Sequence, residues 1–402
     1  MQKQTQQKVP NLRFPEFKDE WRTRKLGEIS NFWNGAAHEQ SIVDSGKYIV
    51  VNSKFISSNG RVKKYSNDQI SPFKHGDIAI VMSDIPNGKA LAKCFLVDIN
   101  DAYTLNQRIG GINSDKIISP FLINILSRNK YFLRIDNGVS QTNLRRDEVL
   151  KCPIIYPSTS EQQRISEFVG SVDKWIENLK KQKEEWEKYK KGMMQKIFSQ
   201  KITFKDENGK EFPDWEDKRL SEVATFRRGS FPQPYGLRKW YDDKDGFPFI
   251  QVYDVDDNFK LKDSTKRKIS EDAKKLSVLV KKGTIILTIQ GSIGRIAITQ
   301  YDACVDRTLL IFTSFKVPIN IMYFAYIVFL LFEIEKMKAP GGTIKTITKE
   351  ALSSFRLLIP SLTEQQKIAE FLTSIDNVIE SKQKQINSAE SWKKGLMQRM
   401  FI

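Results

Sequence analysis

The stretch that decides the fold occurs twice: 157-PSTSEQQRISEF-168 returns as 360-PSLTEQQKIAEF-371. Further along, 191-KGMMQKIF-198 returns as 394-KGLMQRMF-401. Both matches have the same offset of 203 residues (360 − 157 and 394 − 191). Because a loop would have tolerated insertions and deletions, two copies that stay in register over this length predict two rigid rods of equal length.

Each copy predicts one long helix. Apolar residues recur along 165–197 and along 368–400 in alternating steps of four and three, which is the pattern of a coiled-coil seam. The few lysines in the seam can lay their stems along the groove while the ammonium groups stay wet. Ser160 and Thr363 are the predicted N-caps. Since one such helix cannot bury its seam alone, we expect the two helices to pair with each other, with a long helix of a partner protein as the alternative.

The two halves of the chain also match outside these helices. The segment 21-WRTRKLGEI-29 resembles 215-WEDKRLSEV-223 at an offset of 194, so the chain is a tandem duplication whose second copy is nine residues longer (203 − 194). The middles of the two copies have diverged, but each predicts a buried strand, a helix that opens near a proline and a closing strand. The predicted strands lie at 78–82, 153–156, 285–289 and 356–359.

These features predict an α/β (α+β) protein with two mixed α/β domains in tandem, separated by two long helices and related by a pseudo-twofold axis. The predicted divisions are an N-terminal tail (1–20), a first domain (21–156), a first long helix (157–199), a linker (200–214), a second domain (215–359) and a second long helix (360–402).

The charge balance predicts an anionic partner. The 402 residues include 65 Lys+Arg against 48 Asp+Glu, which gives a formal net charge of +17 and a pI near 9.5. Nucleic acid is the first candidate and an acidic membrane surface the second, although a merely soluble basic surface would show the same excess. Three separated cysteines and two histidines argue against disulfides, zinc sites and histidine-based catalysis. With no signal peptide and no apolar run of membrane-spanning length, we expect a reduced, cytoplasmic protein.

The repeated motifs resemble those of the specificity subunits of type I restriction–modification systems. The resemblance is carried by Pro-Ser-x-x-Glu-Gln-Gln-(Arg/Lys)-Ile at the head of each long helix, by Lys-Gly-x-Met-Gln near its end and by Gly-x-Ser-Gln-x-Asn-Leu at 138–144. It covers about 14–402. The second half departs from the last motif, because 341–345 keeps the glycine but not Gln-x-Asn.

This resemblance implies two target-recognition domains, each reading one half of a split sequence in double-stranded DNA, and an antiparallel helical pair that sets the gap between the halves. It also implies assembly with two modification (methyltransferase) subunits and two restriction (translocase/nuclease) subunits. S-adenosylmethionine, ATP and Mg are then expected on those partners, with no cofactor on this chain.

Polar and basic residues in loops at strand ends are the candidates for DNA contact, because Arg and Lys match guanine while Asn and Gln match adenine. For any single residue, an ordinary solvated side chain or a turn hydrogen bond is the alternative. The candidates in the first domain are Lys54, Lys89, Asn106, Gln107, Arg108, Gln141, Asn143, Arg145 and Arg146. The candidates in the second domain are Arg227, Arg228, Tyr235, Arg238, Lys239, Gln290, Arg295, Arg307 and Lys345. A basic cluster that suits a solvated face as well as a DNA-backbone contact consists of Lys262, Lys266, Arg267 and Lys268.

The polar residues at the heads of the long helices are predicted to dock the modification subunits, with plain helix capping as the alternative. These residues are Glu161, Gln162, Gln163, Glu364, Gln365 and Gln366.

The sequence predicts neither a catalytic constellation nor a metal site. An amino-methyltransferase needs an (Asn/Asp)-Pro-Pro-(Tyr/Phe) loop, and the nearest approach, 232-PQPY-235, lacks both the polar residue and the proline pair. No Gly-x4-Gly-Lys-(Ser/Thr) loop is present, and the carboxylates of 214–217 are too close in sequence to surround a metal ion. We therefore expect a non-catalytic DNA-recognition subunit. The alternatives are a stand-alone DNA methyltransferase or nuclease and a basic scaffold for RNA or protein.

Overall fold

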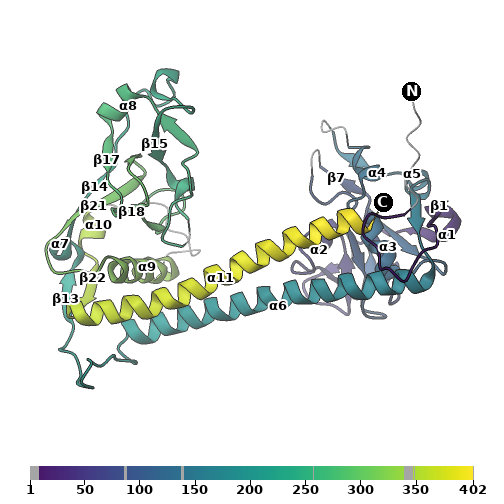
Figure 1. Ribbon diagram of the computed structural model, residues 1–402, viewed down its shortest axis with the longest axis horizontal. Coiled ribbons are helices and arrows are strands. Elements are labelled where there is room, and N and C mark those ends of the chain that lie inside the picture. Colours follow the sequence, from purple (N-terminus) through teal and green to yellow (C-terminus); the bar gives the residue numbers. More distant parts are fainter. Residues whose placement is uncertain are drawn as a thin grey trace. The chain divides into compact units, whose positions relative to one another are not determined.

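The computed structural model describes residues 9–85, 88–136, 140–256, 258–338, 347 and 349–401 (Figure 1). The chain divides into two compact units, a first unit of Met1–Leu179 with Ile386–Ile402 and a second unit of Lys180–Gln385. The division falls within both long helices, α6 (Thr159–Phe198) and α11 (Leu362–Met400), so each helix contributes residues to both units. Their lengths of 40 and 39 residues confirm the predicted pair of long helices.

The predicted N-caps are wrong, because Ser160 and Thr363 lie inside the helices. In α11 the cap is Ser361, whose Oγ accepts a hydrogen bond from the backbone N–H of Glu364 at 3.3 Å. A capping side chain satisfies a donor two or three residues further on, so the residue that precedes the first helical turn takes this role.

The core of the first unit is an antiparallel sheet in the order β2 (Asn31–Asn34), β10 (Ile109–Asn113), β6 (Ile78–Val81), β8 (Cys94–Leu96). Side chains of a strand alternate between the two faces of a sheet. In β6, Ile78 and Ile80 enter one apolar cluster while Ala79 and Val81 enter another, so both faces of this strand are buried. Burial on both faces explains why this part of the sequence is a continuous apolar run.

A second sheet of the first unit has the order β3 (Ile42–Val43), β5 (Tyr65–Ser66), β4 (Tyr48–Val51), β9 (Tyr103–Leu105), in which β4 and β9 are parallel. Two short pairs complete the strands: β1 (Arg22–Lys25) with β12 (Pro153–Tyr156), and β7 (Ser83–Asp84) with β11 (Thr142–Asn143). The helices of this unit besides the long ones are α1 (Leu26–Ile29), α2 (Ser53–Ser57), α3 (Ser119–Leu126), α4 (Lys130–Leu133) and α5 (Arg146–Leu150).

The second unit repeats this plan. One sheet has the order β14 (Ala224–Arg228), β21 (Leu309–Phe315), β18 (Ile285–Thr288), β19 (Ile296–Ile298). The other has the order β16 (Arg267–Ile269), β15 (Phe247–Ile250), β20 (Ala303–Val305), β17 (Val278–Val280), with β15 and β20 parallel. The pair β13 (Glu216–Arg219) and β22 (Arg356–Ile359) joins the ends of the domain. The helices are α7 (Leu220–Val223), η1 (Arg238–Trp240), η2 (Val252–Asp254), α8 (Glu271–Leu276), α9 (Ile321–Lys338) and α10 (Lys349–Ser353).

The apolar run at 321–332 forms part of α9, where Tyr323, Phe324 and Tyr326 are completely buried. No helix among the described residues is long and apolar enough to cross a membrane.

The two long helices pair within each unit, as predicted. In the first unit Val172, Ile176 and Leu179 of α6 share an apolar cluster with Ile386 and Ala389 of α11. In the second unit the later part of α6, including Met194 and Ile197, packs with the earlier part of α11, including Ile375 and Ile379. The late residues of one helix thus meet the early residues of the other, which makes the pair antiparallel.

An ion pair crosses between the helices at the corresponding place in each unit. Lys190 Nζ lies 2.6 Å from Asp376 Oδ1 in the second unit, and Lys393 pairs with Asp173 in the first. Both members are displaced by the repeat offset of 203 (393 − 190 and 376 − 173). Because each pair links a lysine of one helix to an aspartate of the other, these contacts help to fix the register of the helices.

The predicted N-terminal tail and linker pack in corresponding ways against the ends of the long helices. The N–H of Leu12 donates to the Arg399 carbonyl at 2.9 Å, and the N–H of Ile202 donates to the Lys196 carbonyl at 3.3 Å. Phe14 and Phe204 follow two residues later, and their rings contact Phe168 and Phe371 of the repeated helix heads. Leu12 and Phe14 therefore pack against the first unit's apolar core.

Candidate DNA interface

The Glu-Gln pair at the head of each long helix is buried, which removes four of the six predicted docking residues from the surface. Glu161 and Gln162 are each 1% exposed, and Glu364 and Gln365 are 3% and 1% exposed. Gln162 accepts a hydrogen bond from the Ile118 N–H at 3.0 Å and donates to the Pro157 carbonyl at 3.0 Å. The repeated Glu-Gln pair thus links each α/β domain to its long helix. Burial of these four side chains argues against direct docking through them, and their docking role stays a prediction.

Gln365 makes the corresponding bonds in the second unit. Its Oε1 accepts from the Asn320 N–H at 2.8 Å, and its Nε2 donates to the Pro360 carbonyl at 2.9 Å. The remaining two docking candidates, Gln163 and Gln366, are exposed. Each donates along its own helix to a glutamate four residues later, at 2.9 and 3.0 Å.

The two buried glutamates have different partners. Glu161 accepts from Arg13 Nε and Nη2, both at 2.7 Å, and from the Trp21 indole at 3.3 Å. Glu364 accepts from the Trp215 indole at 3.0 Å, and no cation among the described residues pairs with it. The alignment of Leu12 with Ile202 places Thr203 where the first unit has Arg13.

This difference appears in the acid–base properties. The hydrogen bond to Glu161 raises the pKa of Arg13 despite partial burial of the guanidinium. Burial raises the pKa of Glu364, and the Trp215 hydrogen bond offsets only part of that effect. A buried carboxylate without a counter-ion is disfavoured because the charged form has lost its water.

The structure brings five first-unit candidates together at one edge of the core. Asn106, Gln107 and Arg108 form the turn between β9 and β10. The N–H of Asn106 donates to the last residue of β4 at 3.1 Å, and the Arg108 carbonyl accepts from Met82 at the end of β6 at 3.0 Å. From the neighbouring pair β7–β11, Gln141 Nε2 donates to Ser83 Oγ at 2.7 Å. Asn143 faces Ser83 in the β7–β11 register and is exposed.

The other four first-unit candidates are exposed but more widely spread. Lys54 lies on α2, which starts directly after β4, and Lys89 lies in the loop that follows β7. Arg145 and Arg146 open α5, and the Arg146 guanidinium lies 5.8 Å from the centre of the Phe32 ring.

The second unit gathers five of its candidates at the corresponding edge. Arg227 and Arg228 end β14, and the next residue, Gly229, donates its N–H to the Leu309 carbonyl at 3.0 Å. Arg307 lies in the turn between β20 and β21, with its guanidinium 5.6 Å from the Tyr235 ring centre. Gln290 is exposed and directly follows Ile289, whose N–H donates to the Thr308 carbonyl at 3.0 Å.

A glycine makes this edge possible in both units. A Cβ on Gly35 would lie 2.1 Å from the Asn106 carbonyl oxygen, and a Cβ on Gly229 would lie 2.2 Å from the Val305 carbonyl oxygen. Only glycine allows two backbones to approach so closely. The strand end and the turn that carries the polar side chains are therefore held against each other.

A buried carboxylate organises the second-unit edge. Asp306 is 2% exposed and accepts hydrogen bonds from the Tyr235 hydroxyl at 2.8 Å and the Thr308 N–H at 2.9 Å. Gln251 Nε2 donates to the Tyr235 hydroxyl, and the Tyr253 hydroxyl donates to Gln251 Oε1. Burial, together with the charge of Asp306, raises the pKa of Tyr235, so this hydroxyl remains a hydrogen-bond donor at neutral pH.

The remaining second-unit candidates lie on other elements or outside the described residues. Arg238 and Lys239 are exposed on η1, where the Lys239 ammonium lies 4.3 Å from the Trp240 ring centre. Arg295 is half-buried at the start of the strand region that leads into β19. Lys345 lies outside the described residues.

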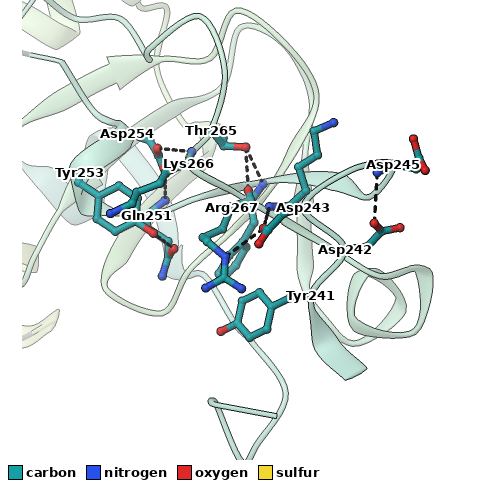
Figure 2. Close-up of polar contacts among 12 residues, drawn as sticks. Tyr241, Asp242, Asp243, Asp245, Gln251, Tyr253, Asp254, Thr265, Lys266 and Arg267 are labelled. Carbon is teal, nitrogen blue, oxygen red and sulfur yellow. Dashed lines mark hydrogen bonds and ion pairs between the residues drawn. The ribbon is translucent and has the colours of Figure 1, made fainter. Parts of the chain in front are cut away.

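Sequence reasoning missed Gln251, Asp306 and the aromatic residues whose rings contact the basic cluster. Figure 2 shows Arg267 of this cluster: its Nε donates to Asp243 Oδ1 at 3.0 Å, and its guanidinium lies 3.9 Å from the Tyr241 ring centre. The density of positive charge at 262–268 was the available signal. The tyrosine and aspartate partners of Lys266, Arg267 and Lys268 lie at 241–253, 13 to 26 residues away in sequence, and only the fold brings them together.

Comparison with known proteins supplies the family. The model of the type I restriction modification DNA specificity domain matches residues 18–188 and 213–391. The type I restriction enzyme MjaX specificity subunit of Methanocaldococcus jannaschii is 25% identical over 95% of this chain and 93% of its own length. The type I restriction enzyme EcoBI specificity subunit of Escherichia coli is 24% identical over 71% of this chain and 65% of its own length.

The fold is also shared with a solved structure. The crystal structure of the S subunit of a type I restriction–modification system from M. genitalium covers 98% of this chain and 99% of its own, with 17% identity and a TM-score of 0.58. Because the family model matches both halves separately, in the order that the tandem repeat requires, this chain belongs to the family of type I restriction–modification specificity subunits.

Proposed function

We propose that this chain is the DNA-recognition subunit of a type I restriction–modification complex, in which each unit reads one half of an asymmetric bipartite target. The observation that carries the proposal is a pair of corresponding turns. Both are held by backbone hydrogen bonds to the ends of equivalent strands, as for Asn106 on Val51 and Asp306 on Ile250. The first turn presents Asn-Gln-Arg (106–108) and the second Asp-Arg-Thr (306–308).

Different side chains on the same backbone support different half-sites. Asn and Gln suit adenine and Arg suits guanine, while exposed Lys and Arg elsewhere supply sequence-independent contacts to phosphates. The net charge of +17 favours such contacts. Because one chain supplies both domains, the two half-sites need not be related by symmetry, in contrast to the palindrome read by a homodimer.

The antiparallel helices, each contributing to both units, are proposed to set the number of base pairs between the half-sites. Methylation and cleavage then belong to two modification and two restriction subunits, which carry S-adenosylmethionine, ATP and Mg, while this chain is non-catalytic. The names of the similar proteins, which describe specificity subunits of type I restriction enzymes, support this division of roles.

Mapping methylated adenines tests the proposal in cells that carry this chain with its modification subunits. We expect a single motif of two unlike half-sites separated by a constant number of unspecified base pairs. A continuous motif, a palindromic motif or methylation without sequence preference would contradict the bipartite reading.

The exposed glutamines at the helix heads are the remaining docking candidates. Gln163 and Gln366 occupy equivalent positions and make equivalent bonds, to Glu167 and Glu370. Replacing both glutamines with alanine is expected to reduce co-purification of the modification subunits, because each substitution removes two amide hydrogen-bonding groups from the proposed contact. The matched control is alanine at Ser171, an exposed residue two turns further along α6. Unchanged co-purification of the glutamine variant would exclude these residues from docking.

A further inference from the structure

We propose that Arg267 reads a guanine in the half-site of the second unit, and that Asp243 and Tyr241 are positioning residues that hold its guanidinium for this contact. The inference rests on the proposed function, since it assigns a base to a domain that is proposed to bind DNA. It adds a specificity-determining residue that lies outside the turn at 306–308.

The position of Arg267 is fixed by three kinds of contact. It opens β16 at the edge of its sheet and pairs in register with Phe249 of β15. Its Nε donates to Asp243 Oδ1 at 3.0 Å, and its guanidinium lies 3.9 Å from the centre of the Tyr241 ring. The side chain is still 37% exposed. Stacking on an aromatic face and pairing through Nε together define both the plane and the direction of the guanidinium.

The terminal nitrogens of this arginine remain available. Among the described residues, neither Nη atom of Arg267 has a hydrogen-bond partner. In Figure 2 the dashed contact between Arg267 and Asp243 ends at Nε, and both Nη atoms lie at the tip of the side chain. A guanine presents two acceptors, O6 and N7, in the major groove, and the two parallel N–H groups of an arginine fit them bidentately.

The carboxylate that orients Arg267 is itself held. Asp243 Oδ1 also accepts the backbone N–H of Lys268 at 3.1 Å. Partial burial opposes ionisation of Asp243, but the hydrogen bonds from Lys268 and Arg267 outweigh it and lower the pKa of this carboxyl. Asp243 therefore stays charged at neutral pH and keeps its hold on Arg267.

Arg267 also belongs to the same packed group as the predicted reading edge. The Tyr241 hydroxyl donates to the Tyr235 carbonyl at 3.0 Å, and the ring of Phe231 contacts both tyrosines. The Arg307 guanidinium in turn lies over the ring of Tyr235. The second unit thus has two neighbouring arginine–tyrosine pairs joined through Phe231, and a DNA surface that reaches Arg307 extends naturally to Arg267.

Guanine is favoured over phosphate by the chemistry of the surroundings. A phosphate contact needs only a mobile positive charge, and exposed lysines such as Lys262 and Lys266 provide it beside Arg267. The orientation of Arg267 is already fixed by Asp243 and Tyr241, so its side chain loses little conformational entropy on binding. Its fixed geometry can then distinguish guanine from the other bases.

The first unit has a lysine at the corresponding position. Asn106 bonds to Val51 as Asp306 bonds to Ile250, so Val50 corresponds to Phe249. The partner of Val50 on the neighbouring strand is Lys64, whose carbonyl accepts the Val50 N–H at 2.8 Å. Lys64 is exposed and makes no ion pair among the described residues. This asymmetry restricts the proposed guanine contact to the second half-site.

The experiment compares the methylated motif of the complete complex containing wild-type chain, Arg267→Lys, Asp243→Asn or the control Arg219→Lys. Arg267→Lys keeps the charge but loses the bidentate fork, so preference for guanine at one position of the second half-site should fall roughly 5- to 150-fold. Asp243→Asn should weaken the same preference in the same direction. Neither variant is expected to change the first half-site or the spacer. The control Arg219→Lys should leave the whole motif unchanged. Lys64→Ala should leave the second half-site unchanged.

Two results would overturn the assignment. One is a motif that Arg267→Lys leaves unchanged at every position. The other is a uniform loss of affinity for all sequences, which identifies a phosphate contact. If Arg267→Lys does not assemble, Asp243→Asn decides by the same criteria. A wild-type complex without any bipartite motif would instead refute the proposed function, so the two failures are distinguishable.

Discussion

Replacing residues 22–156 with the corresponding domain of another specificity subunit is expected to change one half-site of the methylated target completely and to leave the other half-site unchanged. Specific DNA binding commonly exceeds non-specific binding by roughly 10³-fold or more, so methylation at the original half-site should fall by at least about that factor. The measurement is the adenine methylation motif before and after the exchange.

The structure explains why this exchange should preserve folding. Arg22 and Tyr156 face each other in the β1–β12 register, so the exchanged segment begins and ends at neighbouring positions. The contacts of Glu161 with Arg13 and Trp21 lie outside the segment and are retained. Gln162 binds the exchanged domain through a backbone N–H, that of Ile118, which every residue except proline can supply.

The second domain provides the reciprocal control. Glu216 and Ile359 face each other in the β13–β22 register, so exchange of 216–359 is the equivalent operation. It is expected to change only the other half-site. If either exchange altered both half-sites, or neither, the two domains would not be independent reading elements.

Removing the charge of Glu161 is expected to lower stability much more than removing the charge of Glu364. Glu161→Gln keeps the shape of the side chain but leaves the partly buried Arg13 without a counter-ion, at a cost of about 2 to 3 kcal/mol in the free energy of unfolding. For a unit of this size that corresponds to a fall of roughly 4 to 12 °C in the melting midpoint. Thermal unfolding at pH 7 measures it.

Glu364→Gln is expected to be neutral or stabilising at the same pH. Its folded-state pKa is raised, chiefly by burial, so the stability linked to its protonation is present below the unfolded pKa, about 4.3. That stability is lost as the pH rises through the raised folded-state pKa. Because the glutamine does not titrate, the variant does not lose this stability, and its Oε1 can still accept from Trp215. The free energy of unfolding of the variant should therefore increase relative to that of the wild-type chain as the pH rises through that window.

The exposed Glu167 of α6 supplies a control for both substitutions. Glu167→Gln removes a charge from the same helix without touching a buried group, and it should leave the melting midpoint nearly unchanged. Equal effects of Glu161→Gln and Glu364→Gln would show that Arg13 does not distinguish the two helix heads.

The most regular features were predicted best from the sequence. The equal helices, their pairing, the buried strands at 78–81 and 285–288 and the closing strands at 153–156 and 356–359 all follow from local hydrophobic period and from the repeat. The repeated Glu-Gln pair was noticed, but its burial was not predicted. Polar residues repeated in register suggest a shared surface, yet Glu161 and Gln162 are 1% exposed because Trp21, Arg13 and Ile118 close over them.

The residues proposed to contact DNA were likewise predicted only in part. Asn106, Gln107, Arg108 and Arg307 of the two corresponding turns were candidates from the sequence, but the role of Asp306 as an internal hydrogen-bond acceptor was not predicted. The orientation of Arg267 was beyond reach, because Asp243 and Tyr241 lie more than 20 residues away and meet it only across the β15–β16 edge.

By itself, the sequence determined that this chain is a duplicated protein with two long helices, two α/β domains and a basic surface, since periodicity, repeat offset and net charge are properties of the linear chain. Only the tertiary structure decided which polar residues are buried between a domain and its long helix and which are exposed. This depends on partners distant in sequence. Arg13 pairs with Glu161, whereas no cation among the described residues pairs with Glu364. Tyr241 and Asp243 orient the Arg267 guanidinium.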